Sequence, residues 1–273
     1  MKIFLSYPPD IHSIPNESMS RIVDQRPSQI LTMVREREFA SIEHLAAHFD
    51  VTQQTIRRIV NRLCDEGRLR RLHGGVGLPV LGQNIAYQNR QALNLAAKQR
   101  IARAVSEIIP DGASVMIGLG TTLECIALAL SDRLDLRVIT NSLNVASALA
   151  RNPGVEINIA GGTLRARDRD IIGDSAAAFF SRFKADFGVF GVGGIDEDGG
   201  LLDFHQGEVE ARQAIVENCR TAVLVADVSK FGRNATVRGG HLDDCDLFYT
   251  DAPVPMAFRA LTERVPAKIH AVD

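Results

Sequence analysis

Apolar residues recur at helical spacing in three short segments near the N-terminus. Pro27 opens the first segment, as prolines often do in a first helical turn, and Ser41 and Thr52 are suited to cap the other two. The apolar positions of the three segments are, in order, Ile30, Leu31 and Val34; Ile42, Leu45, Ala46 and Phe49; and Ile56, Ile59, Val60 and Leu63. The pattern predicts three helices, the third from Gln53 to about Asp65, with a tight turn before it.

A glycine-centred hairpin follows the third predicted helix. Gly67 is a natural helix terminator, and residues 68–72 and 76–78 flank His73-Gly74-Gly75. We interpret this stretch as a two-stranded wing around a glycine turn. Residues 26–80 are therefore predicted to form a winged helix-turn-helix.

Beyond Pro110 the pattern changes to short apolar runs that alternate with amphipathic stretches. The runs predicted as strands are residues 114–117, 137–140, 155–160, 187–192, 222–226 and 247–250. The stretches predicted as helices are residues 123–130, 143–150, 176–183 and 209–218. This alternation is typical of a mostly parallel open sheet covered on both faces, so the fold class is expected to be α/β.

The length of 273 residues suits two domains. We expect a disordered arm over residues 1–25, in which Met19 is a candidate translation start that N-terminal sequencing would test. The winged helix-turn-helix over 26–80 comes next, and residues 81–96, rich in Asn and Gln with little periodicity, are expected to be a linker. The open-sheet domain is expected to cover residues 97–265.

Charge is unevenly distributed between these parts. The net charge of the whole chain is −2. Residues 26–80 contain nine Arg and six acidic residues, whereas the chain after residue 80 has a net charge of −4. A small basic module joined to an acidic one is typical of nucleic-acid binding by the module alone. Cys64, Cys125, Cys219 and Cys245 lie far apart, which argues against disulfides and zinc and favours a reducing cytoplasm. No apolar run approaches the roughly 20 residues of a membrane span.

The third helix of such a motif usually enters the major groove of DNA, where Gln suits adenine and Arg suits guanine. Arginines in the wing are placed to reach phosphates or the minor groove. The candidate DNA-binding residues are Thr52, Gln53, Gln54, Thr55, Arg57, Arg58, Arg62, Arg70, Arg71 and His73. The alternative is a solvated basic helix, which the order of turn, cap, helix stop and wing disfavours.

A second anion site is predicted at Gly118-Leu119-Gly120-Thr121-Thr122, between a strand and a helix. Free backbone N–H groups, the helix dipole and threonine hydroxyls at such a turn suit a phosphate. Leu123 breaks the dinucleotide fingerprint, and no lysine follows as in a nucleotide-binding P-loop. The alternative is a plain strand-to-helix turn.

Further polar clusters follow other predicted strands, and the carboxyl ends of strands are where open α/β sheets bind ligands. Lys230 suits a phosphate, and Asp196 or Glu208 suits ligand hydroxyls. The candidate effector-binding residues are Gly120, Thr121, Thr122, Asn141, Gly161, Gly162, Asp196, Glu208 and Lys230. We expect no catalytic residues, no metal and no cofactor.

The stretch Thr52-Gln53-Gln54-Thr55-Ile56-Arg57-Arg58 and the stretch from Gly67 to Gly75 resemble the signature of the DeoR family of bacterial repressors. Ile59 stands where the family usually has Asp. The resemblance, which covers about residues 26–255, implies an operator-binding homo-oligomer and a sensor domain with a ribose-5-phosphate isomerase-like fold. It implies that a sugar or polyol phosphate binds there without turnover and releases the DNA.

Within the family, residues 194–204, Glu208 and residues 229–235 resemble the branch that responds to glycerol 3-phosphate, which implies that effector. Gly118 and the segment 205–207 depart from the usual residues of this branch. Two alternatives stay open: a phosphosugar isomerase with Asp196 or Glu208 as general base, and a DNA-binding scaffold without a ligand. The fused helix-turn-helix favours the repressor, because an isomerase does not need one.

Overall fold

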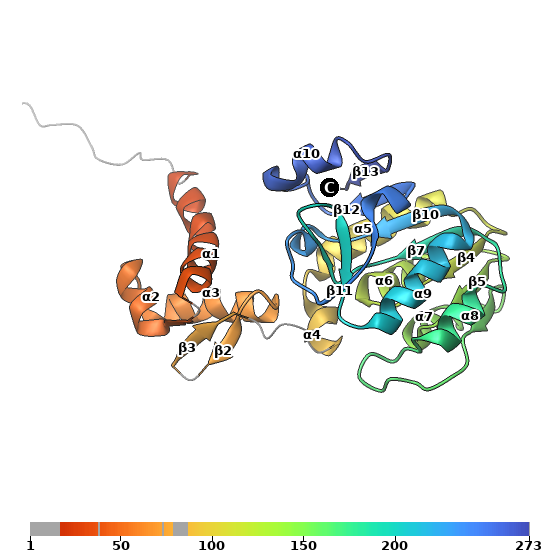
Figure 1. The fold of residues 1–273 in the computed structure, drawn as a ribbon, viewed down its shortest axis with the longest axis horizontal. Helices are drawn as coiled ribbons and strands as arrows, with labels where there is room; N and C mark the ends of the chain where they lie inside the picture. The colour runs from red at the N-terminus through yellow and green to blue at the C-terminus, as the bar shows by residue number, and fades with distance from the viewer. Residues whose placement is uncertain (1–16, 38, 73, 79–86, 273) are drawn as a thin grey trace, which may run out of the picture. The chain divides into compact units, whose positions relative to one another are not determined.

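The computed structural model describes residues 17–37, 39–72, 74–78 and 87–272 (Figure 1). The chain divides into two compact units. The N-terminal unit comprises the chain up to Cys64 together with Leu69–Leu78, and the C-terminal unit comprises Asp65–Arg68 together with the chain from Pro79 onward. None of the helices described is both long and apolar enough to cross a membrane.

The N-terminal unit is a helical bundle with a small sheet. Its elements are α1 (Glu17–Arg37), β1 (Phe39–Ser41), α2 (Ile42–His48), α3 (Gln53–Asp65), β2 (Arg70–Leu72) and β3 (Gly75–Gly77). The Ser41 hydroxyl accepts from the N–H of His44 at 3.1 Å, and Thr52 Oγ1 accepts from the N–H of Thr55 at 3.2 Å. Both caps predicted from the sequence are confirmed, and so are the bounds of α3.

Two features of this unit differ from the expectation. Helix α1 begins at Glu17, so residues 17–25 are helical rather than part of an arm, and Pro27 lies inside the helix instead of opening it. Residues 1–16 of the expected arm lie outside the described residues. Pro27, Ile30, Leu31 and Val34 are all buried, so packing against the unit's core outweighs the hydrogen bond that Pro27 cannot donate.

The wing is one strand larger than expected. Strand β1 pairs antiparallel with β3, and β3 with β2, in the order β1-β3-β2. A Cβ on Gly75 would stand 2.4 Å from the carbonyl oxygen of Ala40 and 2.7 Å from the Phe39 ring. Gly75 therefore lets β1 approach closely, whereas Gly74, at φ +75°, makes the turn. Three residues are too few for β1 to show a strand period in the sequence.

The C-terminal unit is built on a seven-stranded, all-parallel sheet with the order β13-β12-β10-β7-β4-β5-β6. These strands are β4 (Ser114–Ile117), β5 (Arg137–Thr140), β6 (Glu156–Ile159), β7 (Ala185–Phe190), β10 (Cys219–Val225), β12 (Leu247–Thr250) and β13 (Lys268–Ala271). Each strand predicted from the sequence is present within a few residues. Strand β13 extends the sheet past residue 265, where we expected the domain to end.

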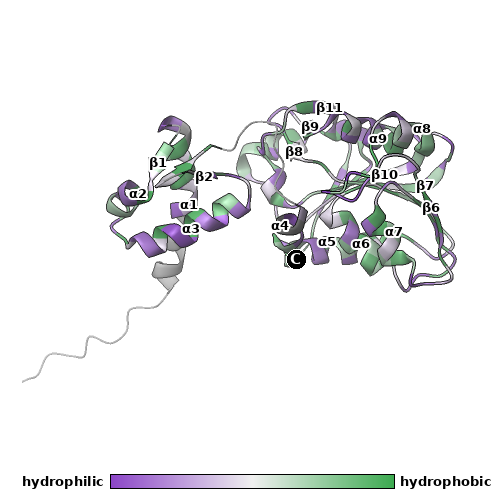
Figure 2. Ribbon diagram, turned by 90° about the horizontal axis from the view of Figure 1, so that it is seen from below, coloured by the Kyte–Doolittle hydropathy of each residue, from purple (hydrophilic) through white to green (hydrophobic). Residues whose placement is uncertain are grey.

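Helices cover both faces of this sheet (Figure 2). On one face lie α5 (Leu95–Ile108), α6 (Thr121–Ala129) and α7 (Leu143–Leu149), and on the other α8 (Asp174–Phe180) and α9 (Gln206–Glu217). Each layer has its own hydrophobic cluster, one centred on Ile101, Ile126 and Val145 and one on Phe180, Ile215 and Phe248. Burial on both faces explains why the strands show continuous apolar runs rather than alternation.

Smaller elements complete the C-terminal unit. Strands β8 (Gly194–Ile195), β9 (Gly200–Asp203) and β11 (Val237–His241) form an antiparallel sheet in the order β11-β9-β8. Helix α4 (Tyr87–Ala92) stands where we expected linker, and the short helices are η1 (Val228–Lys230), η2 (Leu242–Asp244), η3 (Met256–Phe258) and α10 (Arg259–Thr262).

The strand order creates a topological switch point in the seven-stranded sheet, between β4 and β7. After β4 the chain adds β5 and β6 on one side, and then returns to place β7 against the other side of β4. The loops that leave β4 and β7 therefore diverge, which opens a crevice outside the carboxyl ends of these two strands.

Candidate nucleic-acid interface and anion pocket

Helix α3 separates its apolar and polar residues onto opposite faces. Ile56, Ile59, Val60 and Leu63 are buried in the core of the N-terminal unit. The exposed side chains at the other face are Gln53, Gln54, Arg57, Arg58 and Arg62. The burial of Ile59 confirms that this residue serves packing. The exposed face carries three arginines and two glutamines, the groups suited to phosphates and base edges.

The first turn of α3 is locally ordered. Thr52 Oγ1 lies 3.0 Å from Thr55 Oγ1 in addition to its bond with the Thr55 N–H. Arg57 Nη2 donates to Gln53 Oε1 at 3.4 Å. These contacts are local to the first turn of the helix and leave the Arg57 and Gln53 side chains exposed. In the wing, Arg70 and Arg71 are exposed on β2, and the candidate His73 lies outside the described residues.

A cavity of about 70 Å³ occupies the crevice at the switch point between β4 and β7. Three loops line it, each leaving the carboxyl end of a strand: the loop after β4, the loop after β7 and the loop after β10. Their lining residues are Leu119, Gly120, Thr121 and Thr122; Gly191, Val192 and Gly193; and Asp227, Ser229, Lys230 and Arg233. We call this cavity the anion pocket for the groups that face it.

The first of these groups is the N-terminus of α6. Gly120 precedes the helix at φ +128°, a conformation that residues with a side chain rarely adopt. The first bond of the helix runs from the Glu124 N–H to the Gly120 carbonyl at 3.0 Å. The N–H groups of Thr121, Thr122 and Leu123 precede that bond, so they have no partner within the helix and are available to an anion.

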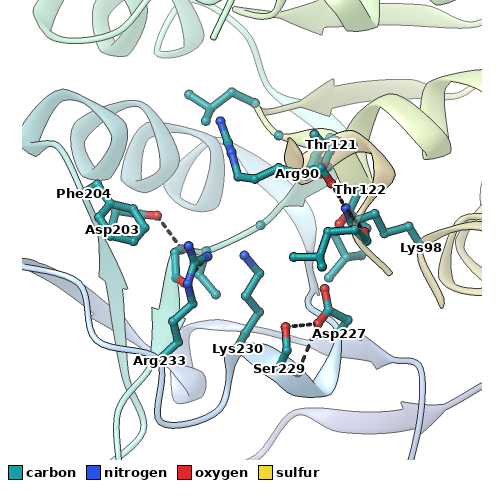
Figure 3. Close-up of a pocket in the computed structure, with 18 of the residues that line it drawn as sticks. Arg90, Lys98, Thr121, Thr122, Asp203, Phe204, Asp227, Ser229, Lys230 and Arg233 are labelled. Atoms are coloured by element: carbon teal, nitrogen blue, oxygen red, sulfur yellow. Dashed lines mark hydrogen bonds between the residues drawn. The ribbon is translucent and has the colours of Figure 1, made fainter. Parts of the chain in front are cut away.

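Cations converge on the same space from other segments (Figure 3). Lys230 and Arg233 project into it from the loop after β10, and Arg90 reaches it from α4. Burial, together with the neighbouring Arg233, lowers the pKa of Lys230 to about 7, and burial with Arg90 lowers the pKa of Arg233 to about 10. Within the part of the chain that the structure describes, the Lys230 ammonium has no hydrogen-bond or ion-pair partner. The positive charge gathered in the pocket therefore favours the binding of an anion.

The carboxylates in the pocket wall are already engaged. Asp203 accepts from the N–H of Gly193 at 2.8 Å and from Arg212 Nε at 3.1 Å. Asp227 accepts from Asn94 Nδ2 and the Ser229 N–H, both at 3.1 Å. Burial raises the pKa of Asp203 to about 6 despite Arg212, whereas Lys230 and Ser229 outweigh burial and lower that of Asp227.

Glu208, a candidate general base of the isomerase alternative, is also occupied. Its Oε1 accepts from Arg165 Nη2 at 2.8 Å, and its Oε2 accepts from the N–H of Phe204 at 3.3 Å. Arg165 in turn makes two 2.7 Å bonds to Asp170. Both carboxylate oxygens of Glu208 therefore already accept hydrogen bonds from the protein itself.

The structure brings together only part of the predicted effector set. Gly120, Thr121, Thr122, Glu208 and Lys230 line the anion pocket. The other four candidates lie elsewhere: Asn141 lines a smaller neighbouring cavity, Gly161 and Gly162 follow the edge strand β6, and Asp196 lies in the turn between β8 and β9. All follow strands, but position in the sheet decides which loops reach the pocket, and that order is invisible in the sequence.

Several pocket residues were missed. Arg90 lies in the segment that we interpreted as linker and Lys98 lies two residues beyond it, while Asp203, Phe204 and Arg233 were noted only as part of a resemblance. Lys98 is buried, and its ammonium donates to the carbonyl oxygens of Arg90 and, at 2.6 Å, of Leu93. The sequence signal that could have identified Lys98 is its position on the apolar face of a helix, where a lysine is unusual.

Comparison with known proteins decides the family. Residues 26–80 match the DeoR-like helix-turn-helix domain, and residues 93–252 match the DeoR C terminal sensor domain. The chain belongs to the DeoR family. As a member of it, this protein is a DNA-binding transcriptional repressor with a sensor domain for a small molecule, and not an enzyme.

Named relatives extend over most of the chain. The glycerol-3-phosphate regulon repressor of Escherichia coli (strain K12) is 45% identical over 233 residues, which are 85% of this chain and 92% of the relative. The repressor of the same name from Haemophilus influenzae is 43% identical, over 84% of this chain and 89% of the relative. The transcriptional repressor CsqR of Escherichia coli is 39% identical, over 86% and 90%.

Solved structures resemble part of the chain. Ribose 5-phosphate isomerase A from Methanocaldococcus jannaschii is 16% identical, with a TM-score of 0.39, over 50% of this chain and 55% of that chain. The strand order of the chain itself and the two family domains establish the fold.

Proposed function

We propose that this repressor binds its operator through α3 and the wing, and that glycerol 3-phosphate in the anion pocket releases it. The observation that carries the proposal is the convergence of the α6 N-terminus with Lys230 and Arg233 on one cavity whose carboxylates already have partners. A dianionic phosphate supplies the charge that this arrangement lacks. The names of two relatives more than 40% identical favour glycerol 3-phosphate as the effector.

Each part of the pocket has a role in this proposal. The N–H groups and hydroxyls of Thr121 and Thr122 receive phosphate oxygens, and Lys230 and Arg233 neutralise them. The glycerol hydroxyls extend toward Glu208, whose carboxylate stays bonded to Arg165 and so orients a donor without abstracting a proton.

On the DNA side, Gln53, Gln54, Arg57 and Arg58 of α3 are proposed to read bases, while Arg62 and the wing arginines contact phosphates. Helix-turn-helix proteins usually act as symmetric dimers on half-sites about one helical turn apart. A homo-oligomer is therefore proposed, and light scattering on the purified protein tests it.

The function is tested by fluorescence anisotropy with labelled promoter fragments and a random duplex of equal length. We expect the promoter to bind more tightly, and glycerol 3-phosphate to weaken that binding where glycerol and inorganic phosphate separately do not. Equal binding of promoter and random duplex contradicts operator recognition. Release by ribose 5-phosphate but not by glycerol 3-phosphate contradicts the effector.

A further inference from the structure

Helix α4 is fastened to the C-terminal unit by the side chains of Tyr87, Arg90 and Gln91. Tyr87 Oη donates to Glu124 Oε2 at 2.7 Å, and Gln91 Nε2 lies 3.1 Å and 3.2 Å from the two oxygens of the same carboxylate. The Arg90 guanidinium pairs with Asp168 and stacks 5.1 Å above the Tyr87 ring. We expected linker here, but the structure has a docked helix.

The groups that hold α4 and its C-terminal end are also groups of the anion pocket. Arg90 and Lys98 both line the cavity, and Lys98 donates to the backbone carbonyl of Arg90. Just after the helix, Asn94 Nδ2 donates to Asp227 at 3.1 Å and to Ser229 Oγ at 3.4 Å, and both acceptors line the cavity. A ligand that fills the pocket therefore meets the same atoms that position α4.

Arg90 stands between two competing environments. It pairs with Asp168, in the loop between β6 and α8. It also lines the cavity that Lys230 and Arg233 enter (Figure 3). The charge of Arg90 lowers the pKa of both Lys230 and Arg233, so the three cations repel one another while the pocket lacks an anion. A phosphate reverses this repulsion and attracts the guanidinium inward, away from Asp168.

We infer that Arg90 is an effector-binding residue, and that exchange of its guanidinium from Asp168 to the effector phosphate transmits effector occupancy to α4. The inference rests on the proposed function and names the regulation of the same site. Helix α4 is the first element described after the wing, eight residues (79–86) beyond Leu78. A shift of α4 therefore acts on the chain that leads directly from the DNA-binding unit.

The test uses the full-length protein, with operator affinity measured without effector and at saturating glycerol 3-phosphate. The ratio of the two affinities is the release factor, which for allosteric proteins is typically about 5- to 150-fold. We expect Arg90→Gln to reduce this factor to below about 2-fold. Arg137→Gln removes an exposed pair with Glu156, on the edge of the sheet, and is the matched control whose factor stays at the wild-type value.

For Asp168→Asn we expect a stronger response to the effector. This variant also tests the inference if Arg90→Gln fails to fold. Because the neutral amide competes less for the guanidinium, the half-maximal effector concentration should fall several-fold. An Arg90→Gln variant that shows the full release factor at saturation, or an Asp168→Asn variant with an unchanged half-maximal concentration, overturns the inference. If the wild-type protein itself shows no release, the proposed function fails, which is a different result from either variant behaving like wild type.

Discussion

Replacing Lys230 with Met should stabilise the protein without effector and remove its response to effector. Burial and Arg233 lower the pKa of Lys230 from 10.5 to about 7, which corresponds to about 5 kcal/mol at 1.36 kcal/mol for each pH unit. Because the side chain remains partly exposed, solvent screening reduces this value, and we expect a gain of about 1–2 kcal/mol in the free energy of unfolding.

The gain should depend on pH in a defined direction. The pKa of Lys230 is lower in the folded than in the unfolded state, so between about pH 7 and 10.5 the unfolded chain binds more protons and wild-type stability rises with pH. The destabilising contribution of Lys230 is therefore fully present below pH 7 and is lost toward pH 10.5. The Met variant should exceed the wild type at pH 6, and the difference should shrink by pH 10.

Urea denaturation at pH 6 and pH 10, with and without glycerol 3-phosphate, measures both effects. The effector should stabilise the wild type and leave the Met variant nearly unchanged, since loss of a charge-assisted bond costs about 1.5–3 kcal/mol, or about 10- to 150-fold in affinity. Lys268→Met, at an exposed position on β13, is the control and should shift stability by less than about 0.5 kcal/mol. A Met variant less stable than wild type at pH 6, or equally stabilised by effector, refutes the reasoning.

Other predictions concern the DNA-binding unit. Arg57→Ala or Arg58→Ala should weaken operator binding by about 1–3 kcal/mol if that arginine contacts a guanine, and an unchanged anisotropy titration removes the residue from the interface. The logarithm of the operator association constant should fall linearly with the logarithm of salt concentration, by about 0.9 for each phosphate contacted; a flat salt titration argues against phosphate contacts. Gly75→Ala should destabilise the protein by about 1–3 kcal/mol, because the new Cβ would lie 2.4 Å from the Ala40 oxygen. Gly161→Ala, which meets no atom within 4 Å, should leave the urea midpoint unchanged, and equal effects of the two glycine variants would contradict the packing argument.

Competition with the effector explains why Lys230 has no acidic partner among the described residues. An acidic partner for Lys230 would stabilise the effector-free protein, but it would compete with the phosphate that the pocket is proposed to bind. The structure instead engages Asp203 and Glu208 with Arg212 and Arg165. A binding site that keeps a desolvated cation gives up stability for affinity, which is a general trade-off at functional sites.

Local interactions made much of this protein predictable from its sequence. The bounds of α3 and the caps at Ser41 and Thr52 follow from contacts within four residues, and the buried strands show as short apolar runs. The glycine-threonine turn before α6 was recognisable because Gly120 and the two threonines that follow are adjacent in the chain. These features depend on neighbours along the chain, so composition and spacing were sufficient.

Only the tertiary structure decided which of the loops after strands share a pocket. The position of β7 beside β4 created the crevice and brought Lys230 and Arg233 to the Thr121 turn, while Gly161 was left two strands away. The helical content of residues 17–25 and the docking of α4 were likewise set by packing and by partners distant in sequence, such as Glu124 and Asp168. The physical reason is that burial across the whole sheet determines which strands are neighbours. That burial depends on residues far apart in the sequence, so a short segment does not reveal it.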